Sequence, residues 1–168
     1  MKPIKPIVTE DPKKLYDYIN LKITGFLSEE SDWLANFSNV SAILKLLLSD
    51  INWAGFYFLK NEELVLGPFQ GLPACTRLKI GKGVCGTAVE EDKIQLVEDV
   101  NKFPGHVACD EASNSEIVLP IHYKDKVIGV LDIDSPKIGR FKEIDMEGLR
   151  KIVYSIEQYI DFKNMEFI

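Results

Sequence analysis

The chain has 168 residues, of which 46% are hydrophobic, and this size predicts one domain with its own hydrophobic core. Its net charge of −6, from 26 acidic and 20 basic residues, argues against nucleic acid or an anionic membrane surface as a partner. The N-terminal residues lack the apolar core of a signal peptide and no apolar run has the roughly 20 residues of a membrane helix, so we expect a cytoplasmic protein.

Two amphipathic helices are predicted within about residues 13–49, because apolar residues recur there at spacings of three and four; Ser31 is the expected cap of the second helix. The pattern then changes to strands, NWAGFYFLK and ELVLGPFQ, which form a predicted hairpin at Asn61-Glu62. Short strands in TRLKI and KIQLVEDV enclose a short helix in GVCGTAVEED. SEIVLPIHY and VIGVLDIDS are two further strands, and a helix over about residues 142–163 closes the chain.

These elements predict an α+β fold in a single domain that spans residues 1–168. Its centre is a mainly antiparallel sheet, with helices on one side and long loops on the other. The strands and the candidate site all lie within about residues 52–135.

Paired carboxylates lie on the last predicted strand. Its period of two places Asp132 and Asp134 on one face, within about 7 Å of each other. Crowded carboxylates can retain a proton near neutral pH or bind a cation, although a solvated strand face is the simpler interpretation. Glu116 begins the neighbouring strand and joins this face if the loop at Lys124-Asp125 has three residues, whereas a two- or four-residue loop turns it away.

Two aromatic residues, Trp53 and Tyr57, share a face of the first strand because their separation of four is even. A core position is the more common place for each of them. If the same face carries the carboxylates, the aromatic rings suit a small cationic or polarizable ligand.

The chain contains three cysteines, Cys75, Cys85 and Cys109. In a reducing compartment an odd number argues against structural disulfides and leaves buried thiols, metal ligands or redox chemistry. Zinc is only weakly indicated, because His106 and Cys109 are close in sequence but no CxxC pair is present. Redox chemistry needs two sulfurs that can meet, and Cys109 lies in a turn-rich loop. The helix start near Cys85 is expected to lower the pKa of that thiol.

This combination resembles a GAF domain, and within that superfamily it is similar to the stand-alone free methionine-(R)-sulfoxide reductases. The matching stretches are NWAGFY, LGPFQGLPACTRLKIGKGVCGTA, FPGHVACDEASNSEIVLPI and VIGVLDIDS, which cover most of residues 50–140. The resemblance implies a six-stranded antiparallel sheet with helices packed on one face and ligand-pocket loops on the other.

The resemblance also implies roles for the candidate residues. Cys109 matches the family's nucleophile and Cys75 its disulfide partner, while Cys85 matches a third cysteine whose role as nucleophile or auxiliary resolving residue stays open. The residues that match the family's pocket carboxylates and aromatics are Glu116, Asp132, Asp134, Trp53 and Tyr57.

The implied reaction is the thiol-dependent reduction of free L-methionine-(R)-sulfoxide. A thiolate attacks the sulfoxide sulfur, a carboxylic acid protonates the oxygen, and the remaining carboxylates bind the substrate's ammonium. The resulting sulfenic acid condenses with a second cysteine, and a thioredoxin-like dithiol restores both thiols. This chemistry requires no metal and no organic cofactor. The oligomeric state stays open, with a homodimer among the alternatives. The competing hypothesis is a GAF small-molecule sensor without catalysis. The acidic face argues against it, because a basic cluster that could bind a phosphate is missing there.

Overall fold

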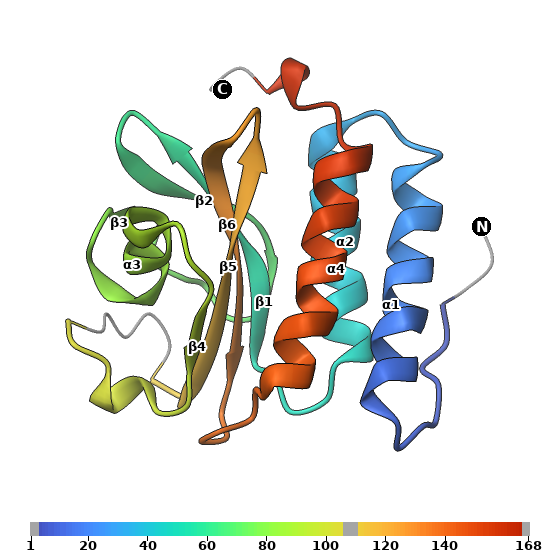
Figure 1. Ribbon diagram of the computed structural model, residues 1–168, viewed down its shortest axis with the longest axis horizontal. Helices are drawn as coiled ribbons and strands as arrows, with labels where there is room; N and C mark the ends of the chain where they lie inside the picture. The colour runs from blue at the N-terminus through green and yellow to red at the C-terminus, as the bar shows by residue number, and fades with distance from the viewer. Residues whose placement is uncertain (1–3, 106–110, 166–168) are drawn as a thin grey trace.

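The structure is a computed structural model that describes residues 4–105 and 111–165. A six-stranded sheet lies between a layer of three helices and a second layer that contains one short helix and several loops (Figure 1). The helices are α1 (Pro12–Leu27), α2 (Trp33–Leu47), α3 (Gly83–Glu91) and α4 (Glu143–Tyr159), with 3₁₀ turns at Val100–Lys102 and Phe162–Asn164. The strands are β1 (Trp53–Lys60), β2 (Glu63–Gln70), β3 (Arg77–Lys79), β4 (Gln95–Val97), β5 (Ser115–Tyr123) and β6 (Lys126–Ser135).

The strand order in the sheet is β3-β2-β1-β6-β5-β4, and every neighbouring pair is antiparallel. This arrangement confirms the predicted α+β fold with a six-stranded antiparallel sheet. Unlike the other helices, α3 lies on the loop side of the sheet (Figure 1).

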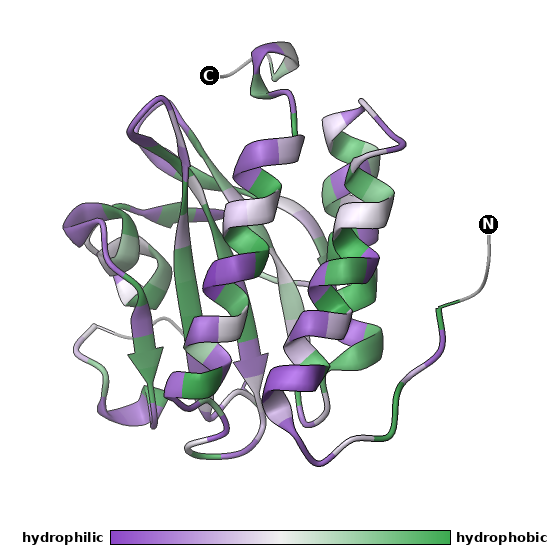
Figure 2. Cartoon of the chain, turned by 45° about the vertical axis from the view of Figure 1, so that its right-hand side comes forward, coloured by the Kyte–Doolittle hydropathy of each residue, from purple (hydrophilic) through white to green (hydrophobic). Residues whose placement is uncertain are grey.

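The main core lies between the sheet and the layer of α1, α2 and α4. These helices alternate apolar and polar stripes along their length, as their spacing predicts (Figure 2). Phe37 of α2 packs edge-on against two rings of β1, with centroid distances of 4.6 Å to Phe56 and 4.8 Å to Phe58. These residues alternate along β1 with Trp53 and Tyr57, which belong to the cluster on the opposite face. The period of the strand therefore separates the core from the candidate site.

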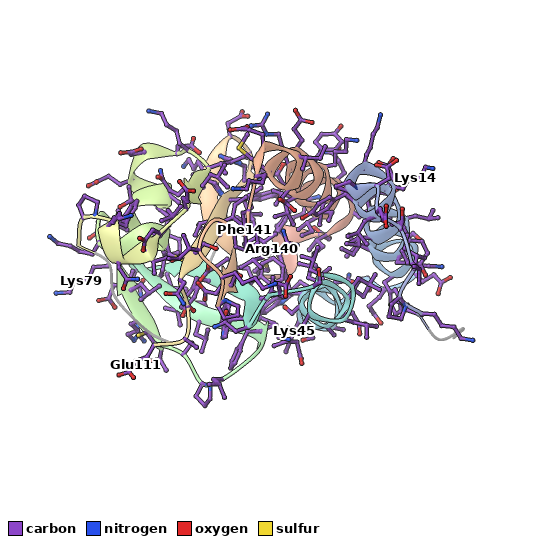
Figure 3. The ribbon with its side chains drawn as sticks, turned by 90° about the horizontal axis from the view of Figure 1, so that it is seen from below. Lys14, Lys45, Lys79, Glu111, Arg140 and Phe141 are labelled. Carbon is purple, nitrogen blue, oxygen red and sulfur yellow. The ribbon has the colours of Figure 1, made fainter. Side chains whose placement is uncertain are left out.

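Helices α1 and α4 make close contact at Gly148. A Cβ atom at this position would lie 2.2 Å from Cγ of Tyr16, so the ring needs the space that glycine leaves. The Tyr16 hydroxyl donates to Asp145 Oδ1 at 2.7 Å, and Arg140 Nη1 donates to the same oxygen at 3.0 Å. Seen from below, Arg140 and Phe141 lie near the middle of the molecule, with Lys14 of α1 on one side and Lys79 of β3 on the other (Figure 3).

Several local predictions can be compared with the structure. The hairpin at Asn61-Glu62 is confirmed, and both residues have the positive φ, 49° and 65°, that a tight two-residue turn requires. The predicted cap at Ser31 is wrong: Asp32 caps α2, because its extended backbone lets its side chain accept from Ala35 N–H at 2.7 Å. The last helix ends at Tyr159 rather than near residue 163, since the next residue is extended.

The loop between β5 and β6 has two residues, Lys124 and Asp125, because Tyr123 pairs with Lys126. The prediction that Glu116 faces Asp134 only with a three-residue loop is therefore wrong. Glu116 nevertheless pairs with Asp134, because the register shifts by one residue between Ile121 and His122. A β-bulge in β6 supplies the extra residue that the loop lacks. Beyond the bulge, each residue of β5 pairs one position further along β6, so Glu116 faces Asp134.

Among the parts of the chain that the structure describes, no helix is both long and apolar enough to cross a membrane.

Candidate functional site

A pocket lies on the face of the sheet opposite the layer of α1, α2 and α4. It is bounded by β1 and β6, by helix α3, and by the segment that joins β2 to β3. Its cavity of about 40 Å³ is partly open. Six of the predicted site residues line it, namely Trp53, Tyr57, Cys85, Glu116, Asp132 and Asp134. The lining also includes residues that the sequence did not single out as site residues, among them Leu72, Pro73, Ala74, Lys82 and Ser113. The first three precede Cys75 directly, so their place beside a candidate cysteine was a signal that could have found them.

The three predicted carboxylates meet on one patch of the sheet. Asp134 pairs with Trp53 of β1 on one side and with Glu116 of β5 on the other. Asp132 precedes Asp134 by two residues in β6 and lies on the same face. Glu116 and Asp132 are both buried, with 6% of each residue exposed. The strand alternation thus concentrates acidic groups in a site with little access to water.

Burial is the main cause of the unusual protonation of these acids. It raises the pKa of Asp132 to about 7. Burial also raises the pKa of Glu116 well above its usual range, and the nearby charges of Asp132 and Asp134 raise it further. The site therefore retains carboxylic acid protons at a pH where exposed carboxyl groups have lost them.

Cys85 lies in the first turn of α3, and its expected low pKa is wrong. The thiol is buried, and burial raises its pKa well above the usual value, with the charges of Asp132 and Glu116 adding to the effect. These contributions exceed the stabilisation that a helix N-terminus offers to a thiolate. The thiol donates a long hydrogen bond to Glu116 Oε1, with 3.9 Å between sulfur and oxygen. Cys85 is therefore a protonated, polar part of the pocket wall.

Trp53 and Tyr57 form the aromatic side of the pocket. Their rings are stacked with a centroid distance of 5.9 Å, and Trp53 stacks on Phe69 at 5.3 Å. Each also holds the segment between β2 and β3: Trp53 Nε1 donates to the Leu72 carbonyl at 3.2 Å, and the Tyr57 hydroxyl donates to the Cys75 carbonyl at 3.0 Å. The aromatic residues thus connect the pocket to the segment that carries Cys75.

The three cysteines differ in their state. Cys85 has a free thiol, whereas Cys75 is disulfide-bonded and half-buried. Cys109 and His106 lie outside the described residues, so the roles predicted for them, nucleophile or zinc ligand, stay predictions.

A positively charged residue, Lys82, lies where the start of α3 meets the pocket. Lys82 is the N-cap residue and lines the pocket, and among the described residues no side-chain capping hydrogen bond forms at this helix start. The first N–H groups of a helix and its dipole favour an anion at such a position. The pocket therefore has an acidic wall on the sheet and a positive end at α3.

One group of donor atoms in the pocket is close enough to hold a metal ion. Cys85, Glu116 and Asp132 each offer one such atom, and the three atoms lie within 4.8 Å of one another.

Comparisons with known proteins show which family this chain belongs to. The family model described as a GAF domain matches residues 40–161. The free methionine-R-sulfoxide reductase of Escherichia coli (strain K12) is 51% identical over 147 residues, which cover 88% of this chain and 89% of that protein. The protein of the same name from Saccharomyces cerevisiae is 43% identical over 159 residues, or 90% of this chain and 88% of the relative.

A solved structure gives the same result in three dimensions. The free methionine-R-sulfoxide reductase from Neisseria meningitidis, determined in complex with its substrate, superposes with a TM-score of 0.90 at 38% identity, covering 95% of each chain. The chain therefore belongs to the GAF domain family, among the free methionine-R-sulfoxide reductases.

Proposed function

We propose that this protein reduces free L-methionine-(R)-sulfoxide to L-methionine with electrons from its own thiols. The observation that carries the proposal is the pocket itself, in which Glu116 and Asp132 are buried beside stacked Trp53 and Tyr57. The relatives that share the name free methionine-R-sulfoxide reductase support the substrate class.

The buried acids supply the proton that the reaction needs. When a thiolate attacks the sulfoxide sulfur, the S–O bond breaks only if the oxygen is protonated, since oxide is a poor leaving group. Burial raises the pKa of Asp132 to about 7 and that of Glu116 well above its usual range, so the pocket holds carboxylic acid protons near neutral pH. The aromatic rings stabilise the positive charge that develops on sulfur.

The two ends of the pocket match the two charges of a free amino acid. The acidic wall, with Asp134 at its edge, suits the ammonium, while Lys82 and the start of α3 suit the carboxylate. Methionine sulfoxide inside a polypeptide has neither charge, so the pocket selects the free form.

The cysteines complete the cycle. Cys109 as nucleophile takes the sulfoxide oxygen and becomes a sulfenic acid, and methionine leaves. A Cys75 thiol then attacks that sulfur, which forms a disulfide and releases water. The disulfide-bonded state of Cys75 and the free, buried thiol of Cys85 support Cys75 as the resolving residue. An external dithiol, which we assign to a thioredoxin-like protein in the reducing cytoplasm, returns both cysteines to thiols.

Turnover of free methionine sulfoxide with a dithiol tests the proposal. The (R) epimer of the free amino acid should be reduced, and N-acetylmethionine sulfoxide, which lacks the ammonium, should be a poor substrate. Equal turnover of the two compounds would contradict recognition of the charged amine. Binding of free methionine sulfoxide without turnover would instead favour a small-molecule sensor.

A further inference from the structure

We propose that Cys85, Glu116 and Asp132 form a binding site for Zn²⁺, separate from the cysteine pair assigned to the redox cycle. The inference concerns metal binding by the reduced pocket and does not depend on the proposed reductase activity.

Three different elements bring the ligands together. Cys85 comes from α3, Glu116 from β5 and Asp132 from β6, and one donor atom of each lies within 4.8 Å of the others. The distance from Cys85 Sγ to Glu116 Oε1 is 3.9 Å. Around a tetrahedral zinc ion, bond lengths of about 2.3 Å to sulfur and 2.0–2.2 Å to oxygen place these ligand atoms about 3.6 Å apart. For this pair, the Cys85 sulfur and the Glu116 oxygen, a shift of a few tenths of an ångström thus suffices.

A second observation identifies an oxygen that lacks a partner. Asp132 is 6% exposed, and its Oδ1 is buried without a hydrogen bond to any residue that the structure describes. An unsatisfied buried oxygen is unfavourable, because it has lost its water without gaining a partner. A cation held between this oxygen, Glu116 and the Cys85 sulfur would supply that partner.

The chemistry of the donors selects the metal. A thiolate with two carboxylates suits the borderline-soft Zn²⁺, whereas Mg²⁺ and Ca²⁺ prefer oxygen ligands alone and more of them. Three protein ligands leave the fourth position of a tetrahedral ion to water, and the adjoining cavity of about 40 Å³ has room for it.

Binding requires that the thiol and both carboxyl groups release their protons, so the affinity for Zn²⁺ rises with pH. The metal and the substrate's ammonium would then compete for the same acidic wall. Zn²⁺ would also occupy the acids that hold the proton in the proposed reaction, and it is expected to act as an inhibitor rather than a cofactor.

The test uses a background variant without the other two cysteines, Cys75→Ser/Cys109→Ser, so that zinc bound by the redox pair does not contribute. Calorimetric titration of this protein with Zn²⁺ should show one ion per chain. Co²⁺ should give the near-ultraviolet charge-transfer band of a thiolate ligand. Adding Cys85→Ser should abolish the band and raise the Kd for Zn²⁺ by at least about tenfold.

Asp132→Asn in the same background provides an independent arm if the Cys85 variant does not fold, as judged by near-ultraviolet circular dichroism. It should also weaken Zn²⁺ binding while keeping the thiol. The proposal is overturned if the background variant binds no Zn²⁺. It is also overturned if a folded Cys85→Ser or Asp132→Asn variant binds Zn²⁺ with the same Kd as the background variant. Reductase activity is measured separately on the wild-type chain. The result for Zn²⁺ binding and the result for the proposed reaction can therefore be told apart.

Discussion

Glu116 on β5 lies directly opposite Asp134 on β6, although the turn that connects the two strands has only two residues. The bulge near His122 restores the register, so that both acids face the same side of the sheet as Asp132. A buried carboxyl group beside two other acids keeps its proton. This pairing therefore places a second proton-retaining acid in the pocket beside Asp132.

Replacing Asp134 by Asn should lower kcat/KM for free methionine sulfoxide at least about tenfold, which corresponds to about 1.4 kcal/mol, because an amide keeps the shape of the side chain but not its attraction for ammonium. Steady-state assays measure the effect. Asp125→Asn is the matched control, since this exposed residue belongs to the turn of the same hairpin and its positive φ of 60° is tolerated by Asn. Equal kcat/KM for the two variants would show that Asp134 does not bind the substrate's ammonium.

The free energy of unfolding should fall as the pH rises from about 4 to about 7. In this window the unfolded chain has released the Asp132 proton, whose unfolded pKa is about 3.9, while the folded chain retains it because its pKa is about 7. The folded state binds more protons, so each such group contributes a slope of up to about 1.4 kcal/mol per pH unit. Asp132→Asn should flatten this decline in urea titrations at pH 5, 6 and 7. A slope equal to that of wild type would disprove the raised pKa.

Replacing Cys75 by Ser should limit the protein to a single turnover. One methionine should form per chain, and the nucleophilic cysteine should then accumulate as a sulfenic acid that a dimedone probe labels and mass spectrometry locates. Cys85→Ser should still turn over repeatedly, at a reduced rate, since the serine hydroxyl can donate to Glu116 where the thiol does. Labelled sulfenic acid at Cys85, or full multiple turnover by Cys109→Ser, would reverse the assigned roles.

Gly148→Ala should destabilise the fold by about 1–3 kcal/mol, because its Cβ would overlap the Tyr16 ring in the contact between α1 and α4. Gly25→Ala is the matched control. It also lies in a helix, but its Cβ would meet nothing within 4 Å. This change should stabilise the protein by up to about 1 kcal/mol, since alanine favours the helix. Chemical denaturation of both variants measures the difference, and equal stabilities would contradict the close packing.

Local patterns alone determined much of this protein. Spacings of three and four identified the helices, and the period of two placed Asp132 with Asp134, and Trp53 with Tyr57, on shared strand faces. The turn at Asn61-Glu62 was also predictable, because these properties depend on residues that are close in sequence.

Only the tertiary structure decided how these faces combine. The bulge that turns Glu116 toward Asp134 comes from the pairing of two strands, and a loop length cannot reveal it. The pKa of Cys85 was predicted in the wrong direction, because the sequence shows the helix start but not the burial or the two acids around the sulfur. Register and desolvation are properties of the assembled sheet and its neighbours, so residues far apart in sequence determine them together.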